Sequence, residues 1–373
     1  MNILKIKKNS SGFIVAGGIA FLCSVPAQAM DFKVGNTEAS AYGYVKLDMT
    51  YDVDSKLGNS SGLGAAARLD NVDGQDGHFQ THVYQSRIGL KTVSPVEGGN
   101  LKTVLEGDFY GSGGVFRLRH AYGEWNNVLA GQTWSNFGGF VAGTPLVDFS
   151  GPSGRPVAHR QPQLRYTQGN ASFALEDSSD KGGVVSGAGA QSKLPDFTMR
   201  YTDKSQALKY SVSGVLRHLK FDDNVNEDSA LGWGAALETS LAVSDSLTLR
   251  AGIAHGKGVG GYLDGNPKKN PAYFDTTTSS LETIKTSTGT IGASLKVGPG
   301  AINAAYSQIV ADLDPSAFAA SDNDKLANLW VNYIWSPADK LTFGVEAGYH
   351  QRRTVGDDEG KALRLQGMVQ YAF

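Results

Sequence analysis

The sequence of 373 residues has a single cysteine, no long apolar run after its first 30 residues and no excess of basic charge. Because Cys23 lies near the N-terminus and no cysteine follows it, residues 30–373 cannot be held together by disulfides. No later segment approaches the roughly 20 apolar residues of a membrane-spanning helix. The 34 basic residues do not outnumber the 36 acidic ones, so we expect no nucleic-acid partner. The fold must therefore be stabilised in another way.

The first 29 residues match the pattern of a secretory signal peptide. Three lysines precede an uncharged run from Gly12 to Val25, and Ala27-Gln28-Ala29 provides small residues for cleavage. The uncharged run is too short to cross a bilayer, which takes roughly 20 residues. We therefore predict a signal peptide over residues 1–29. Its removal takes away three lysines and leaves 31 basic against 36 acidic residues, a net charge of −5.

Apolar side chains recur at every second position through residues 30–373. From Val45 to Tyr51, apolar residues occupy the odd positions and polar residues the even ones, which is the period of a β-strand with one apolar face. About sixteen such runs follow one another, and the last ends in Phe373 on its apolar face. Tight turns of roughly two to six residues alternate with long polar loops such as 53–78 and 257–283. This pattern predicts an all-β fold, a transmembrane antiparallel β-barrel of about 16 strands.

The connection between the fifth and sixth predicted strands is unusual in length and composition. Residues 135–159 are rich in glycine and proline and contain several aromatic side chains. Compact domains seldom carry an irregular connection of more than about 15 residues unless it has a function. We therefore expect this segment to matter for the activity of the barrel.

The strand alternation also predicts which side chains face the inside of the barrel. Where the apolar residues face lipid, residues of the opposite parity face the lumen. This rule places five arginines inward on the second, fourth, sixth and eighth strands: Arg87, Arg117, Arg119, Arg165 and Arg200. It also places five carboxylates inward: Asp48, Glu106, Asp108, Glu238 and Glu346. The same rule turns His120 and Tyr122 outward and turns Asn328 and Trp330 towards the pore.

Arginines in a narrow, water-filled pore favour anions, because fixed cations lower the entry barrier for carboxylates. A guanidinium group can hold a carboxylate through two hydrogen bonds while water still allows exchange. Arg155 and Asp148 of the long connection are expected in the same part of the channel. The sequence leaves open whether Arg155 faces the solute or Asp148. It also leaves open whether the wall arginines are neutralised by Asp148, Glu106 or Asp108.

Several motifs resemble a known family. The sixteen predicted strands and the position of residues 135–159 resemble the trimeric porins of Gram-negative bacteria, in which the third long loop folds into the barrel and narrows the pore. G-Y-V-K-L-D at Gly43–Asp48, G-Q-T-W-S at Gly131–Ser135, and D-F-x-G-P-x-G with R-Q-P-Q-L-R-Y-T within Asp148–Thr167 are similar to the DcaP-type porins. That family is associated with dicarboxylates and related organic anions. The resemblance implies a homotrimer in the bacterial outer membrane, in contact with lipid and lipopolysaccharide.

We therefore expect an outer-membrane channel for passive diffusion of small hydrophilic solutes, with a preference for organic anions such as dicarboxylates. The predicted pore residues are Arg87, Arg117, Arg119, Arg155, Arg165, Arg200 and Asp148. A non-specific porin and a closed structural or adhesin barrel are the alternatives.

Catalytic and metal-binding patterns are missing from the sequence. It has no hydrolase signature and no paired histidine spacing, so we expect no catalytic residue, no metal and no cofactor. A phospholipase-like enzyme is disfavoured for the same reason. His255–Gly261 lacks the ending of a phosphate-binding loop, and we expect it in an extracellular loop.

Overall fold

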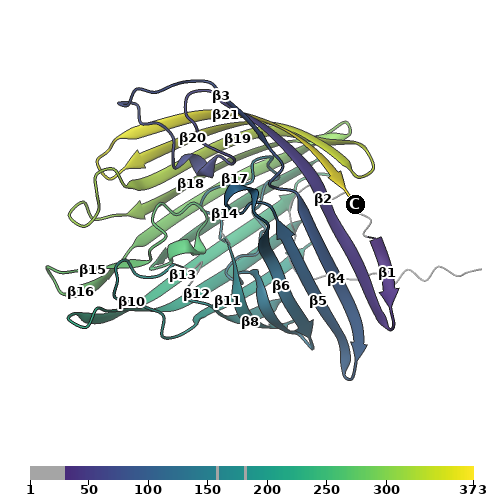
Figure 1. Ribbon diagram of the computed structural model, residues 1–373, viewed down its shortest axis with the longest axis horizontal. Coiled ribbons are helices and arrows are strands. Elements are labelled where there is room, and N and C mark those ends of the chain that lie inside the picture. Colours follow the sequence, from purple (N-terminus) through teal and green to yellow (C-terminus); the bar gives the residue numbers. More distant parts are fainter. Residues whose placement is uncertain (1–29, 157–158, 180–182) are drawn as a thin grey trace, which may run out of the picture.

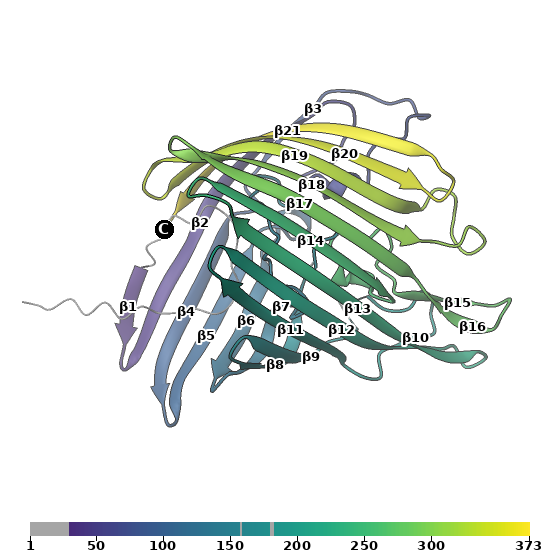
Figure 2. The same ribbon diagram turned by 180° about the vertical axis from the view of Figure 1, so that it is seen from behind.

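Sixteen antiparallel strands in the described part of the chain, residues 30–156, 159–179 and 183–373, form a closed barrel in the computed structural model (Figures 1 and 2). The wall strands pair in sequence order, and β21 pairs with β2, where Tyr44 lies opposite Ala372. The all-β fold and the strand number expected from the sequence are confirmed. The predicted signal peptide, residues 1–29, lies outside the described residues.

The bounds of the elements follow the predicted runs closely. The wall strands are β2 (Thr37–Asp52), β4 (Arg87–Val96), β5 (Gly99–Asp108), β6 (Arg117–Trp125), β7 (Val128–Trp134), β8 (Arg160–Gln168), β9 (Ala171–Glu176), β11 (Asp196–Ser205), β12 (Leu208–Asp222), β13 (Glu227–Ala242), β14 (Leu247–Lys257), β17 (Lys285–Val297), β18 (Gly300–Asp312), β19 (Asn323–Ala338), β20 (Leu341–Thr354) and β21 (Glu359–Ala372).

Shorter elements extend or decorate this wall. The short strands are β1 (Met30–Val34), β3 (His78–His82), β10 (Ala190–Gln191), β15 (Ala272–Asp275) and β16 (Ser280–Thr283), and the 3₁₀ helices are η1 (Gly62–Gly64), η2 (Ser112–Gly114) and η3 (Gly260–Tyr262). β3 and β4 pair with successive parts of β2 and together make the second wall strand. Among the described residues, no helix is long and apolar enough to cross a membrane.

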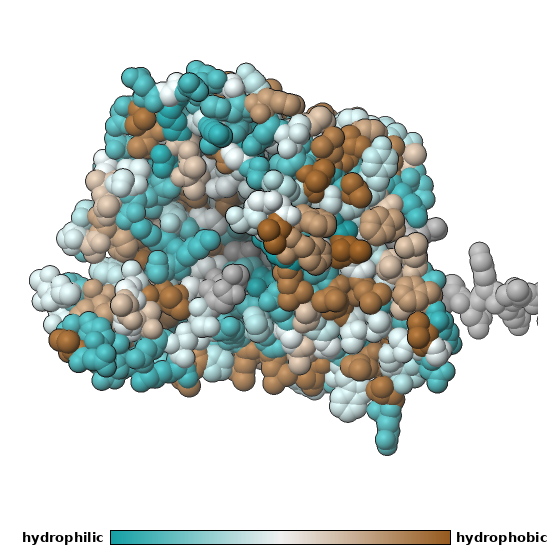
Figure 3. All heavy atoms as spheres, viewed as in Figure 1, coloured by the Kyte–Doolittle hydropathy of each residue, from teal (hydrophilic) through white to brown (hydrophobic). Residues whose placement is uncertain are grey.

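Side chains of the wall alternate between the outer surface and the barrel interior. In β2, Val45 is 53% exposed on the outside, whereas Lys46 and Asp48 are 0% and 1% exposed inside. Apolar residues lie over the outside of the wall, while the loop end, on the left in Figure 3, is mainly hydrophilic. The wall therefore presents apolar side chains to lipid on its outer face and polar side chains to the barrel interior on its inner face.

A β-bulge interrupts the alternation in β6. The pairing of β5 with β6 shifts register between Glu106 and Gly107, which places His120 opposite Glu106 and Tyr122 opposite Val104. Directly paired residues share a face of the sheet, so His120 and Tyr122 face the interior. The prediction that these two side chains point outward is wrong, because one extra residue inverts the parity of the rest of the strand.

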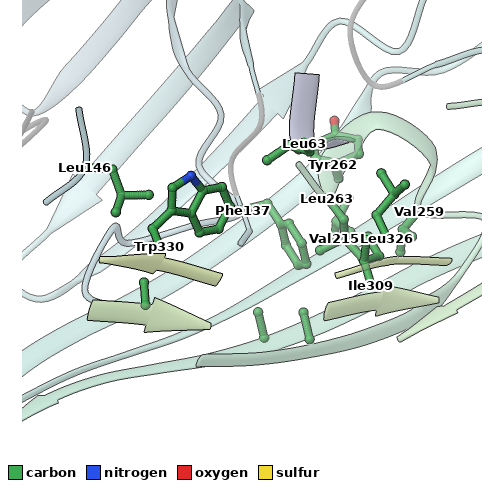
Figure 4. Packing of buried hydrophobic residues seen from close by; sticks show 13 residues of the cluster. Leu63, Phe137, Leu146, Val215, Val259, Tyr262, Leu263, Ile309, Leu326 and Trp330 are labelled. Carbon is green, nitrogen blue, oxygen red and sulfur yellow. The ribbon is translucent and has the colours of Figure 1, made fainter. Parts of the chain in front are cut away.

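Three long loops fold back into the barrel and form a hydrophobic core with one side of the wall (Figure 4). We call them L1 (residues 53–77), L3 (residues 135–159) and L6 (residues 258–284). Leu63 of L1, Phe137 of L3 and Tyr262 of L6 are 5%, 0% and 0% exposed. They pack with inward-facing wall residues such as Ile309 and Trp330. Each fully buried large apolar side chain stabilises this arrangement by about 1.5–3 kcal/mol.

The core corrects two expectations from the sequence. Trp330 is 0% exposed and Asn328 is 1% exposed, with the Asn328 amide donating to the carbonyl of Leu63, so neither side chain lines open pore. The segment His255–Gly261 begins in β14 and continues into L6, where it is buried in the core from Val259 onward. Loops with mainly polar sequences, such as L1 and L6, therefore contain a few apolar residues that are buried inside the barrel.

Candidate functional site

L3 leaves β7 and is fixed to the inner wall by two carboxylates. Glu238 of β13 accepts hydrogen bonds from the backbone N–H groups of Gly139 (2.6 Å) and Ala142 (3.4 Å). Glu346 of β20 accepts the N–H of Val147 and that of the next residue, both at 2.8 Å. Hydrogen bonds to a charged group are worth about 1.5–3 kcal/mol each. These two inward acids are therefore used to hold the loop, and their charge is covered by it.

Asp148 sits where L3 meets L1. Its Oδ2 accepts the N–H of Ser61 at 2.9 Å, its Oδ1 accepts the N–H of Ser150 at 2.7 Å, and Arg364 Nη1 lies 3.5 Å from Oδ2. Burial by itself raises the pKa of Asp148, but the Arg364 guanidinium and these N–H groups outweigh it and hold the pKa below the usual aspartate value. Asp148 is 5% exposed, so the structure places it between two loops rather than on open lumen.

Arg155 reaches L6 and does not contact Asp148. Its Nε donates to Asp264 Oδ2 at 2.8 Å, and its Nη2 donates to the carbonyl of Ser150 at 3.0 Å. Burial raises the pKa of the Asp264 carboxyl, and the Arg155 guanidinium offsets part of that effect. Of the two alternatives that the sequence left open, the pairing of Arg155 with Asp148 is not formed, and Arg155 pairs with Asp264 instead. Arg155 links L3 to L6.

Three of the predicted wall arginines come together around two carboxylates. Arg119 donates from Nε to Glu106 Oε1 and from Nη1 to Asp108 Oδ2, both at 2.7 Å. Arg117 Nε donates to Asp108 Oδ1 at 2.7 Å, and Arg87 Nε lies 3.4 Å from Glu106 Oε1. The Arg119 side chain is 4% exposed, whereas the Arg117 side chain is 36% exposed. Arg117 and Arg119 are two residues apart and therefore share the inner face of β6, and the bulge adds His120 to that face.

The other two wall arginines bind neutral groups at the start of L3. Arg165 donates from Nη2 to the carbonyl of Trp134 at 2.6 Å and from Nε to Gln163 Oε1 at 2.9 Å. Arg200 donates from Nη1 to the carbonyl of Gly138 at 2.6 Å. Neither forms an ion pair with any residue that the structure describes. Their charge is therefore not neutralised by a direct carboxylate partner.

The structure adds Arg160, which the sequence reasoning missed. Its guanidinium carbon lies 4.2 Å from the centre of the Trp134 ring, and that ring also packs against Phe140 of L3 at 5.0 Å. Within the described residues the side chain of Arg160 makes no hydrogen bond or ion pair. It shares the parity of Leu164, which faces lipid, but it is the first residue of β8, where L3 rejoins the wall. A strand end next to a long loop is the sequence signal that could have identified it.

Inward charges of opposite sign differ in how accessible they are. Eight carboxylates of the wall are only 0–7% exposed: Asp48, Asp52, Glu106, Asp108, Glu176, Asp196, Glu238 and Glu346. Four inward arginines of β4, β6, β8 and β11 remain partly exposed, namely Arg87, Arg117, Arg165 and Arg200, as does Arg160 at the start of β8. Around these strands, guanidinium groups are therefore more accessible than carboxylates.

A closed sixteen-stranded barrel whose third long loop folds inward defines a porin channel of the bacterial outer membrane. The chain belongs to the DcaP outer membrane protein family, whose model matches residues 28–373.

Solved structures show the same architecture. The outer membrane channel DcaP of Acinetobacter baumannii is 26% identical, with a TM-score of 0.80 over 92% of this chain and 99% of that chain. An anion-selective porin from Comamonas acidovorans is 15% identical, with a TM-score of 0.57 over 90% and 100% of the two chains. OmpT of Vibrio cholerae is 13% identical, with a TM-score of 0.58 over 92% and 100%. A comparison with curated protein sequences found no match.

Proposed function

We propose that this channel passes small hydrophilic solutes by diffusion and prefers organic anions, dicarboxylates among them. The observation that carries the proposal is that Arg87, Arg117, Arg160, Arg165 and Arg200 are partly exposed, whereas eight carboxylates of the wall are only 0–7% exposed. Arg87, Arg117 and Arg119 pair with only two carboxylates, and Arg160 lies with Arg119 beside the Trp134 ring, which leaves a local charge of +2 in this cluster. A positive wall in a narrow, wet passage lowers the entry barrier for anions and raises it for cations.

The spacing of the arginines suits solutes with more than one carboxylate. Arg117 and Arg160 lie at the end of their strands next to the loops, whereas Arg165 and Arg200 lie further along theirs. A dicarboxylate can therefore exchange one guanidinium contact for another as it advances, without losing all contacts at once. Because each group stays hydrated, binding remains weak enough for release. In this proposal Arg155 and Asp148 fix the loop that sets the cross-section.

A non-specific porin is the second candidate. It is favoured by one observation, the pairing of Arg87, Arg117 and Arg119 with Glu106 and Asp108. Paired arginines contribute less to the field in the lumen than free ones. In this case the selectivity would rest on Arg160, Arg165 and Arg200 alone and would be weak.

We also propose that the chain assembles as a homotrimer. β7 and β9 contain 7 and 6 residues, fewer than the roughly 9–11 that a strand needs to span the hydrocarbon region. A short stretch of wall is best shielded from lipid by neighbouring subunits. One solved form of Vibrio cholerae OmpT, which shares the fold, is described as a trimer. Light scattering on the detergent-solubilised protein measures the subunit number.

Two measurements test the function. The reversal potential across a KCl gradient in planar bilayers gives the ratio of chloride to potassium permeability. Liposome swelling with mono- and dicarboxylates beside neutral sugars of matched size gives the solute preference. We expect a chloride preference and faster entry of dicarboxylates. A reversal potential of zero together with equal rates for sugars and dicarboxylates would establish the non-specific alternative, and absence of conductance would establish a closed barrel.

A further inference from the structure

Two arginines outside the predicted pore set, Arg364 on β21 and Arg217 on β12, are almost completely buried beneath the inward-folded loops. Their side chains are 2% and 1% exposed. We propose that they are positioning residues, which hold the loops against the wall and thereby set the cross-section of the pore. This inference rests on the proposed function, because it assumes that the lumen conducts.

Arg364 joins the wall to both L1 and L3. Its Nε and Nη2 bind the two oxygens of Asp52 on β2 at 2.6 and 2.8 Å. Nη2 also donates to the carbonyl of Gly58 in L1 at 2.5 Å, and Nη1 lies 3.5 Å from Asp148 Oδ2 in L3. Asp52 Oδ2 in turn accepts the N–H of Leu57 at 2.8 Å. One guanidinium group thus contacts two wall strands and two loops.

Arg217 makes a comparable set of contacts on another side of the barrel. Its Nε lies 3.0 Å from Asp196 Oδ2 on β11, and the hydroxyl of Tyr262 in L6 donates to the same oxygen at 2.9 Å. Nη1 donates to the carbonyls of Gly258 (3.2 Å) and the next residue (3.4 Å), and Nη2 donates to the carbonyl of Gly183 at 2.7 Å. L6 and the loop after β9 are therefore held together by one guanidinium group.

The chemistry of these contacts requires arginine. The planar guanidinium presents five N–H groups in a fixed fork, so it can bind a carboxylate on one edge and backbone carbonyls on the other. A lysine ammonium keeps the charge but cannot reach all partners of Arg364 at once. Because both arginines are covered by the loops, a passing solute does not touch them, and they act only through loop position.

The test compares high-salt conductance of Arg364→Lys and Arg217→Lys channels in planar bilayers. At about 1 M salt the screening length is about 3 Å, so conductance reports cross-section rather than charge. We expect each variant to show a conductance raised by roughly 1.5-fold, with larger current noise, as the freed loops leave the lumen for part of the time. A role limited to charge compensation predicts full rescue by lysine.

A double-mutant cycle shows whether Arg364 acts through L3. Asp148→Asn alone should raise the conductance, and adding it to Arg364→Lys should change little more, because both substitutions remove the same contact. Arg353→Lys is the matched control, since Arg353 lies on neighbouring β20 and pairs with Asp324 without contacting L1 or L3. A difference in gel mobility between unheated and heated samples shows that each variant is folded.

Folded Arg364→Lys, Arg217→Lys and Asp148→Asn channels with wild-type conductance and noise would overturn the proposal. The reversal potential, recorded on the same channels, keeps the two proposals separate. A wild-type channel without anion preference whose conductance rises in the lysine variants refutes only the proposed function. An anion-selective channel whose conductance does not respond refutes only the positioning role.

Discussion

Replacing Arg117 with glutamine offers the most direct perturbation of charge selectivity. The Arg117 side chain is 36% exposed and pairs with Asp108, which also retains its 2.7 Å contact with Arg119. The substitution therefore removes one accessible positive charge without leaving a buried carboxylate unpaired. The local charge of the four arginines and two carboxylates falls from +2 to +1.

The size of the effect follows from Coulomb's law. At a distance of about 7 Å in a medium of dielectric constant about 80, a unit charge acts on a passing ion with about 0.6 kcal/mol. With a screening length of about 8 Å at ~0.15 M salt, about 0.25 kcal/mol remains. Removing the charge makes the pore less favourable for an anion by this amount and more favourable for a cation by the same amount. The ratio of anion to cation permeability should therefore fall about twofold. At ~0.01 M salt the screening length is about 30 Å, and the expected change grows to about fivefold.

Reversal potentials at the two salt concentrations test this prediction. Arg353→Gln is the control, because Arg353 is 39% exposed and pairs with Asp324, as Arg117 pairs with Asp108, but lies on the outward face of β20. It should leave the permeability ratio unchanged. If Arg117→Gln channels keep the wild-type ratio at low salt, while their high-salt conductance is also unchanged, then Arg117 does not influence the ion path and the reasoning is refuted.

Three further substitutions or conditions address the position of L3. Glu346→Gln leaves one of the N–H groups of Val147 and Asp148 without an acceptor, which costs about 1–3 kcal/mol. The less firmly held loop should raise the current noise at high salt. Unchanged noise would contradict the anchoring role of Glu346. Gly154→Ala should lower the free energy of unfolding by about 1–3 kcal/mol. The reason is that φ at Gly154 is +69° and the new methyl group would lie 1.5 Å from Thr288 Oγ1. A melting temperature equal to that of the wild type would contradict this packing. Because the folded-state pKa of Asp148 is lowered, its contribution is present above the ordinary aspartate pKa of about 3.9 and is lost as pH falls through the folded value. The difference in high-salt conductance between wild-type and Asp148→Asn channels, which isolates Asp148, should therefore persist down to about pH 4, and its disappearance between pH 6 and 5 would be inconsistent with this account.

The wall of the barrel could be predicted from the sequence because lipid and lumen impose opposite demands on successive residues. From Val45 to Tyr51 the alternation is unbroken, and the structure follows it. In β6 the alternation fails at His120, whose amphipathic ring gives no indication of the side it faces. Only the pairing with Glu106 across the bulge reveals it. Parity is therefore reliable where pairing is regular and fails after an extra residue.

The inward folding of L1 and L6 could not be predicted from the loops themselves. Their apolar residues, such as Leu63 and Val259, are few and lie among glycines and polar residues. The wall strands did contain a sequence signal for inward folding, because Ile309 and Leu326 are apolar residues on the inner face, where they are 0% and 1% exposed. An apolar residue on the lumen side of a porin strand needs a packing partner inside the barrel, and only a loop can supply it.

The position of Arg364 on the last wall strand also links loop placement to the order of folding. β21 completes the barrel by pairing with β2, more than 300 residues earlier in the chain. Until that pairing forms, Asp52 and Asp148 lack their arginine, and the carbonyl of Gly58 in L1 lacks its guanidinium donor. The pairing that closes the wall therefore also fixes L1 and L3 in their positions inside the pore. A barrel that stalls before its last strand inserts is left with loosely held loops and an unsealed lumen.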